Sequence, residues 1–155
     1  MPSASRSQHV LDFTRLDVRQ TIEKQMRKIL DTIPLDYIKW DMNRSLSDVY
    51  SITLDPQRQG EVAHRYMLGL YELLEHLITD YPEILWEGCS GGGGRFDAGF
   101  IYYMPQSWTS DNTDAVERMK IQYGTSLAYP ISSITAHVSA CLLYTSDAAD
   151  ELDGV

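Results

Sequence analysis

The fold of this chain is decided by one stretch, Ile38-Lys39-Trp40-Asp41-Met42-Asn43-Arg44. The apolar run over 35–40 predicts a strand, so Asp41 stands where that strand ends. A second stretch, Trp108-Thr109-Ser110-Asp111-Asn112-Thr113-Asp114, places Asp111 in the same position after another apolar segment. Two carboxylates presented from successive strand ends are what cleavage of a glycosidic bond needs. One attacks the anomeric carbon while the other protonates the departing oxygen.

Helices and strands are expected to alternate along the chain. Helical spacing and start signals predict helices at Arg19–Thr32, Gly60–Thr79 and Asp114–Tyr123. For the last helix we expect Asp111 or Thr113 as the N-cap and Gly124 as the stop. Five short apolar segments are strand candidates, namely 9–14, 35–40, 84–86, 98–105 and 129–138. This alternation predicts an α/β fold with parallel strands and right-handed crossovers.

The residues that could take part in catalysis or binding come directly after the strands. Active-site residues lie at this carboxyl end of the strands in a (β/α)8 TIM-type barrel. The sequence therefore predicts such a barrel, present only as a partial barrel of about four to five βα units. A doubly wound sheet has the same polarity. However, the glycine run at 91–94 lacks the Gly-x-Gly-x-x-Gly helix opening with a ribose-binding acid, so a nucleotide site is disfavoured.

Composition narrows the class of protein. Of 155 residues, 43% are hydrophobic and 23% charged, which is typical of soluble globular proteins. A net charge of -9 argues against a nucleic-acid partner or an anionic membrane surface. No apolar run approaches the ~18 residues of a membrane-spanning helix. Cys89 and Cys141 are too few for a disulfide scaffold, so a reduced, cytoplasmic setting is expected.

No cofactor or metal site is predicted from the residues. The four histidines are scattered along the chain and form no pair with a cysteine at metal-ligand spacing. His64 and His76 fall on a predicted helix, where surface positions are expected. Cys89 is interpreted as a small buried apolar residue that shapes the site, and not as a nucleophile.

Three phrases occur in order and carry a resemblance to a known family. They are Tyr37-Ile38-Lys39-Trp40-Asp41-Met42-Asn43-Arg44, Glu87-Gly88-Cys89-Ser90-Gly91-Gly92-Gly93-Gly94-Arg95-Phe96-Asp97, and Trp108-Thr109-Ser110-Asp111-Asn112-Thr113-Asp114-Ala115. On these the chain resembles the family 36 glycoside hydrolases, the bacterial α-galactosidases, from about Arg6 to Ala140. The resemblance implies a retaining enzyme that hydrolyses terminal α-galactosyl residues of galactosides such as melibiose and raffinose-type oligosaccharides.

The resemblance also implies catalytic roles. Asp41 would be the nucleophile and Asp111 the general acid/base, with their carboxyl groups about 5–5.5 Å apart. We expect the pKa of Asp111 to be raised towards the working pH while Asp41 stays ionised. Lys39 lies two positions before Asp41, on the same face of the strand, and would favour its charged form. Asp114 is a rival acid, ranked second because it would lie in the first turn of the helix.

By the same resemblance, six residues line a galactose pocket: Arg6, Lys39, Asn43, Cys89, Gly92 and Trp108. Long basic side chains suit ring hydroxyls, the amide would bond the 2-hydroxyl, and the glycines let sugar and backbone approach closely. Plain structural alternatives stay open for three of them. Arg6 would then be a solvated surface charge, Lys39 a partner in a strand-end ion pair, and Asn43 a turn residue.

Residues 141–155 do not resemble the family. They are interpreted either as foreign sequence joined to a truncated gene or as an acidic, disordered tail. The domain prediction is therefore a partial catalytic barrel over 1–140 and a non-family tail after it. Open sheet edges in a partial barrel favour aggregation, so the isolated chain is expected to be inactive or poorly folded. The full-length parent is expected to be a homo-oligomer.

Other functions are compatible with the same residues. Related members of the family transfer galactose to sugar acceptors or remove N-acetylgalactosamine. The Cys-Ser-Gly turn and the full Trp-Thr-Ser-Asp phrase favour plain hydrolysis of galactosides. In a different class, the chain would be a non-catalytic galactoside-binding fragment, or a gene fragment that does not fold.

Overall fold

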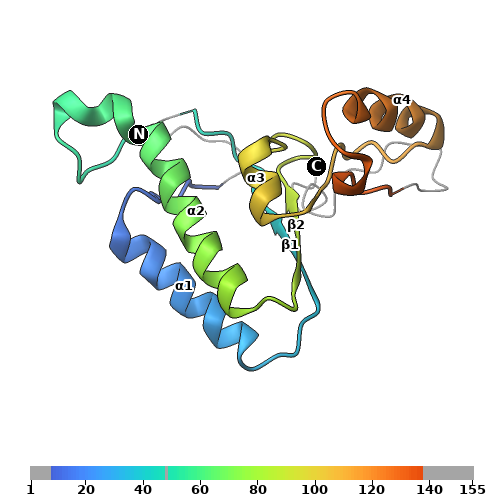
Figure 1. The fold of residues 1–155 in the computed structure, drawn as a ribbon. Helices are drawn as coiled ribbons and strands as arrows, with labels where there is room; N and C mark the ends of the chain where they lie inside the picture. Colours follow the sequence, from blue (N-terminus) through green and yellow to red (C-terminus); the bar gives the residue numbers. More distant parts are fainter. Residues whose placement is uncertain (1–7, 48, 138–155) are drawn as a thin grey trace, which may run out of the picture. The chain divides into compact units, whose positions relative to one another are not determined.

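The computed structural model describes residues 8–47 and 49–137 (Figure 1). The chain falls into two compact units. The described part of the first unit comprises residues 8–36 and 44–84, without residue 48. The second contains 37–43 and the described residues from 85 onward. Within the described residues, no helix is both long and apolar enough to cross a membrane.

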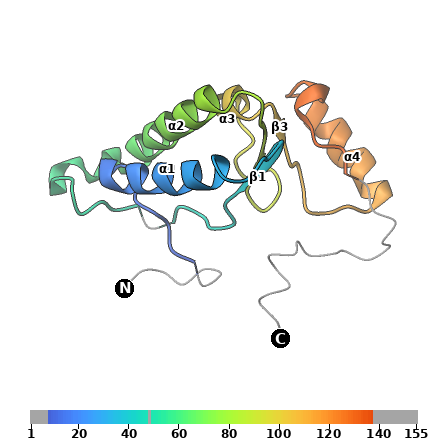
Figure 2. The same ribbon diagram turned by 90° about the horizontal axis from the view of Figure 1, so that it is seen from below.

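Two helices form the body of the first unit. α1 (Leu16–Leu30) and α2 (Val62–Asp80) lie side by side in both views (Figures 1 and 2). A 3₁₀ turn, η1 (Pro56–Glu61), leads into α2. Both predicted helices are confirmed, with α1 beginning at Leu16 instead of Arg19. Ion pairs join them, because Arg27 lies 2.6 Å from Asp80 and Arg19 lies 3.0 Å from Glu72.

The apolar contact between these helices follows the 3.6-residue period predicted for α2. Its buried residues recur on one face of the helix, and the most deeply buried are Leu70, Leu73, Leu74 and Leu77, none more than 1% exposed. Gly69 is also buried there, and a Cβ on it would lie 2.0 Å from the carbonyl oxygen of Phe13. The chain before α1 therefore packs directly on the backbone of α2.

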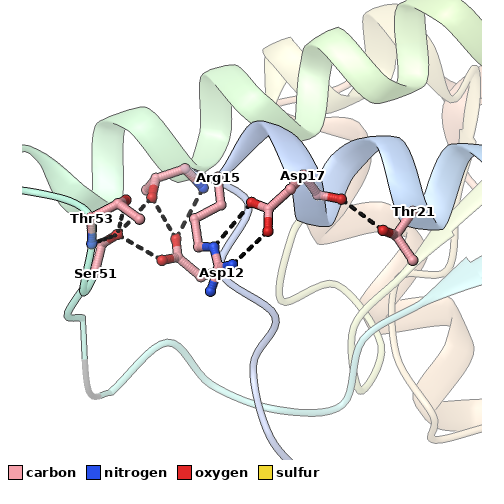
Figure 3. Close-up of polar contacts among 7 residues, drawn as sticks. Asp12, Arg15, Asp17, Thr21, Ser51 and Thr53 are labelled. Atoms are coloured by element: carbon pink, nitrogen blue, oxygen red, sulfur yellow. Dashed lines mark hydrogen bonds and ion pairs between the residues drawn. The ribbon is translucent and has the colours of Figure 1, made fainter.

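The prediction of a strand over 9–14 is wrong, since these residues form irregular backbone and a turn. Asp12 is the reason, because its carboxylate accepts hydrogen bonds from the backbone N–H of Thr14 at 3.1 Å and from the hydroxyl of Ser51 at 2.6 Å. Such local side-chain bonds compete with strand pairing. Figure 3 shows Asp12 directed towards Ser51 while Arg15 pairs with Asp17 at the start of α1.

A parallel sheet forms the core of the second unit. Its strands β1 (Tyr37–Asp41), β2 (Leu85–Cys89) and β3 (Gln106–Ser107) lie in the order β1-β2-β3, and all pairs are parallel. This confirms the predicted α/β fold with a parallel sheet. The described residues contain three strands, which is fewer than the four to five predicted. Isolated parallel bridges add to them, and one of these joins Ser107 to Ile134.

Two of the predicted strands are replaced by other structure. Over 98–105 the chain forms a helix, α3 (Ala98–Tyr103), whose N-cap Asp97 accepts a hydrogen bond from the backbone N–H of Phe100 at 2.9 Å. This cap is a start signal that apolar content alone conceals. Over 129–137 there is a short 3₁₀ turn, η2 (Ile131–Ser133), and the bridge at Ile134. Residue 138 lies outside the described residues.

The helix that follows the second aspartate is α4 (Ala115–Ser126), and its cap differs from the prediction. Asp114 is the N-cap, because its carboxylate accepts from the backbone N–H groups of Val116 and Glu117, each at 3.0 Å. The prediction of Asp111 or Thr113 as the cap is therefore wrong. Gly124 lies inside the helix and does not stop it.

Candidate active site

The candidate site lies at the carboxyl ends of the parallel strands, within the second unit. Asp41 ends β1 and is paired in register with Cys89, which ends β2. Asp41 is exposed, whereas Cys89 is 1% exposed. Because parallel strands present their carboxyl ends at one edge, both side chains belong to the same edge of the sheet.

The thiol of Cys89 is held in its neutral form. Burial raises the pKa of Cys89 to about 12, and the neighbouring carboxylate of Asp41 acts in the same direction. The backbone N–H of Gly92 and the charge of Lys39 act in the opposite direction. A thiol that stays protonated is no nucleophile at neutral pH, so the side chain fills space beside the Asp41 carboxylate.

Asn43 ties the first aspartate to the glycine turn. Its side-chain amide donates to a carboxylate oxygen of Asp41 at 3.0 Å, and its carbonyl oxygen accepts from the backbone N–H of Gly91 at 2.7 Å. Asn43 therefore both stabilises the turn and lies beside the first aspartate. The two bonds fix the direction of the Asp41 carboxylate relative to the turn.

The glycine turn makes a close approach to the loop that carries the second aspartate. Gly91 and Gly92 have φ angles of +53° and +85°, a backbone region that side chains strongly disfavour. A Cβ on Gly92 would lie 2.8 Å from Cα of Ser110 and 3.2 Å from the backbone nitrogen of Asp111. Glycine is therefore required by both backbone angle and space at this position.

Trp108 holds the second carboxylate. Its indole Nε1–H donates to a carboxylate oxygen of Asp111 at 2.9 Å, and both side chains are half-buried. The ammonium of Lys39 lies 3.9 Å from the centre of the indole ring, within the range of a cation–π contact. The lysine of β1 is thereby connected, through one aromatic ring, to the aspartate of the loop after β3.

The structure brings seven of the eight predicted site residues together at this edge. They are Asp41, Asp111, Lys39, Asn43, Cys89, Gly92 and Trp108. The eighth, Arg6, lies outside the described residues, as does the tail over 141–155. In the part of the chain that the structure describes, no group of three or more His, Cys, Asp or Glu side chains is placed to hold a metal ion.

Two charged residues near the site were missed by the sequence reasoning. Arg118 on α4 is 1% exposed and donates to the loop that carries Asp111, at the carbonyl of Ser110 (3.1 Å) and the hydroxyl of Thr109 (3.0 Å). Its sequence neighbours are a mixture of apolar and charged residues, so no local signal indicates its burial.

The second missed residue is Glu87 on β2, which is 3% exposed. It is the register partner of Lys39 and lies two residues before Cys89, on the same face of the strand. Burial raises its pKa, against a smaller opposing effect of Thr135. A signal was present here, since an acidic residue inside an otherwise apolar strand predicts a special environment.

Comparisons with known proteins agree with this arrangement. A profile of the melibiase family matches residues 1–146. Alpha-galactosidase 1 of Pediococcus pentosaceus is 69% identical over 138 residues, which cover 89% of this chain and 19% of that protein. The chain thus spans about a fifth of the length of this relative.

Solved structures match as well. The crystal structure of the family 36 α-galactosidase AgaA from Geobacillus stearothermophilus superposes with a TM-score of 0.84 at 51% identity, covering 97% of this chain and 22% of that one. A variant of AgaA crystallised in complex with raffinose gives the same TM-score at 50% identity, with the same coverage. With a family profile along most of its length and such relatives, the chain belongs to the melibiase family, family 36 of the glycoside hydrolases.

Proposed function

We propose that this chain supplies both catalytic carboxylates of a retaining α-galactosidase. The observation that carries the proposal is that the glycine turn lies against both aspartate-bearing segments. Asn43 bonds to Asp41 and to the turn, and Gly92 leaves no room for a side chain against Ser110 and Asp111. Relatives named as α-galactosidases, and one crystallised with raffinose, support galactosides as the substrate class.

In the first step Asp41 attacks the anomeric carbon of the galactosyl residue. The C1–O bond to the aglycone breaks as the carboxylate forms an ester with C1, and the electron pair of that bond goes to the departing oxygen. Asp111 gives its proton to this oxygen, so the aglycone leaves as a neutral alcohol. The transition state has oxocarbenium character, which the negative carboxylate of Asp41 stabilises.

In the second step water cleaves the galactosyl ester. Asp111, now ionised, takes a proton from the water as its oxygen bonds to C1, and Asp41 leaves as a carboxylate. Galactose is released with the starting configuration, and Asp111 is protonated again. The mechanism needs the two carboxyl groups about 5–5.5 Å apart and a raised pKa for Asp111, and both stay predictions.

Sugar binding is proposed for the residues around the carboxylates. Trp108 is half-buried, so part of its indole surface is accessible, and the ammonium of Lys39 lies 3.9 Å from the centre of that ring. Asn43 lies beside Asp41, where a bond to the 2-hydroxyl would strengthen as charge develops on the sugar. Cys89 and Gly92 shape the floor, and Arg6 is proposed as a further donor.

A partial (β/α)8 barrel over residues 1–140 is the proposed architecture. It is supported by three parallel strands in chain order and by a parallel bridge that continues the order at Ile134. The melibiase profile runs to residue 146, past the boundary proposed for the tail. We further propose a galactoside as the small-molecule partner, a cytoplasmic setting in which Cys89 stays a free thiol, and a homo-oligomeric parent.

The test uses a hybrid enzyme, defined as Alpha-galactosidase 1 of Pediococcus pentosaceus with its matching segment replaced by the 138 residues of this chain that align with it. Hydrolysis of 4-nitrophenyl α-galactoside and raffinose is measured for the hybrid and for its Asp41→Ala and Asp111→Ala variants. Loss of the nucleophile is expected to reduce kcat by more than about 10³-fold, because the covalent route is then closed. Asp41→Ala activity within a few-fold of the parent would contradict the proposal.

The isolated 155-residue chain is measured beside the hybrid. Galactose binding by calorimetry without any hydrolysis would assign the isolated chain a binding function only. Activity on 4-nitrophenyl N-acetyl-α-galactosaminide, or transfer to sucrose, would favour the related reactions of the family over plain hydrolysis.

A further inference from the structure

We propose that Arg118 is a positioning residue that fixes the direction of the general acid/base. It lies on α4, outside the phrases that carry the catalytic residues, and it touches no proposed substrate contact. The inference rests on the proposed function, since it concerns the loop that delivers the Asp111 proton.

The environment of Arg118 is unusual for a helix residue. Its side chain is 1% exposed, and burial lowers its pKa from the ordinary value for arginine. Within the described residues it has no carboxylate partner, and its Nε has no hydrogen-bond partner. A buried cation without a counter-charge lowers the stability of the folded chain. We therefore infer that this arginine is kept for the hydrogen bonds that its guanidinium makes.

All three of its bonds go to the segments on either side of α4. The guanidinium donates to the carbonyl oxygen of Ser110 at 3.1 Å, to the hydroxyl of Thr109 at 3.0 Å, and to the carbonyl oxygen of Thr135 at 2.9 Å. Two of these acceptors belong to the two residues directly before Asp111. The third lies next to Ile134, whose parallel bridge to Ser107 continues the sheet.

The same loop also lies against the glycine turn. A Cβ on Gly93 would lie 2.9 Å from the carbonyl oxygen of Thr109, and one on Gly92 would lie 2.8 Å from Cα of Ser110. Thr109 and Ser110 are therefore in contact both with the backbone of the glycine turn and with the guanidinium of Arg118. With the indole of Trp108 bonded to its carboxylate, Asp111 has little freedom to turn away.

Only arginine meets this geometry. Its planar fork presents several N–H donors in fixed directions, which lets one side chain reach three acceptors at once. Lysine keeps the charge but presents a single ammonium on a flexible stem. Arg118→Lys is therefore expected to preserve the fold while it loosens the loop.

Displacement of the Asp111 carboxyl group affects substrates with poor and good leaving groups differently, whereas general loss of structure does not. A glycoside with a poor leaving group, such as methyl α-galactoside, needs the proton from Asp111 as the C1–O bond breaks. With 4-nitrophenyl α-galactoside the departing phenolate is stable, so C1–O cleavage needs that proton much less. A displaced acid thus slows the first substrate more than the second, whereas partial unfolding slows both equally.

The experiment measures kcat and KM of the hybrid enzyme and its variants on both substrates. For Arg118→Lys we expect kcat on methyl α-galactoside to fall by up to about 100-fold, as for a misplacement of about 1 Å, with a much smaller fall on the nitrophenyl substrate. Thr109→Val removes one acceptor and keeps the side-chain shape, so it should give a weaker effect in the same direction. Arg58→Lys, at an exposed arginine paired with Glu61, is the matched control.

Asp111→Ala gives the reference pattern for loss of the acid. Equal losses on both substrates for Arg118→Lys and Thr109→Val, or no loss, would overturn the inference while the proposed function stands. Should Arg118→Lys lower the folded fraction in circular dichroism, Thr109→Val decides alone. A hybrid that hydrolyses neither substrate before any substitution would overturn the proposed function, and the inference with it.

Discussion

The two aspartates of the Trp108–Asp114 segment show how a single residue acquires its role. From the sequence, Asp111 is a candidate both for the helix cap and for the acid, and Asp114 is a rival acid. The structure gives Asp114 two backbone N–H groups and gives Asp111 the indole N–H of Trp108. The loop between the two aspartates is shaped by local bonds, from Asn112 N–H to the Ser110 hydroxyl and from Asp114 N–H to the Asn112 side chain. Gly92 and Arg118 hold the same loop from elsewhere in the chain.

Glu87 permits a prediction about pH. Burial raises its pKa above 4.5 in the folded chain, so the folded state keeps the proton to higher pH than the unfolded state. Stability therefore falls as pH rises from about 4.5 through the folded pKa and remains reduced above it. Glu87→Gln removes this loss. The thermal unfolding midpoint of the variant minus that of the unsubstituted protein should therefore be larger at pH 7.5 than at pH 4.

The measurement is thermal unfolding of the hybrid enzyme at both pH values. Glu83→Gln, at an exposed position, is the control and should show no such change. A difference between Glu87→Gln and its parent that stays constant with pH would show that the burial of Glu87 does not control its titration.

At the scale of elements, local start signals matter more than apolar content. Segment 98–105 has the composition of a strand, yet Asp97 caps it as α3. α1 and α2 were predictable because many residues repeat the same period, whereas a segment of six residues offers too few repeats to separate helix from strand. Pairing partners then decide between the two.

The cap of α4 gives the prediction at this scale. Asp114→Ala leaves two backbone N–H groups without their acceptor, so the free energy of unfolding should fall by about 1 kcal/mol. In the hybrid enzyme, the ratio of kcat on 4-nitrophenyl α-galactoside to kcat on methyl α-galactoside should be the same with Asp114→Ala as without it. Denaturant unfolding and the two-substrate assay measure both effects. If Asp114→Ala reproduces the kinetic pattern of Asp111→Ala, then Asp114 is the acid.

At the scale of the whole molecule, the described residues expose many large apolar side chains. Those more than 70% exposed are Ile52, Tyr102, Leu127 and Ile131. In a complete barrel we expect such side chains to be covered by other parts of the protein. In the hybrid enzyme the rest of the relative is available to cover it, which fits the proposal of a partial barrel.

The isolated chain should therefore bind the dye 8-anilinonaphthalene-1-sulfonate and associate at micromolar concentration. Per residue, dye fluorescence should be several-fold higher for the chain than for the hybrid enzyme, because buried surface is closed to the dye. Fluorescence titration and sedimentation measure the two properties. Equal fluorescence, together with a monomeric chain, would contradict the proposed partial barrel.

The sequence by itself determined the helices α1 and α2, the strands β1 and β2, and the set of residues at their carboxyl ends. Periodicity and short motifs are local, so they can be recognised without knowledge of the tertiary contacts. Tertiary structure decided the burial of Arg118 and Glu87. The helix at α3 and the start of α4 depend on local caps, Asp97 and Asp114, that the apolar pattern conceals. Burial depends on residues far away in the chain. Local sequence alone therefore does not show whether the partner of a charged side chain such as Arg118 is water or a carbonyl oxygen.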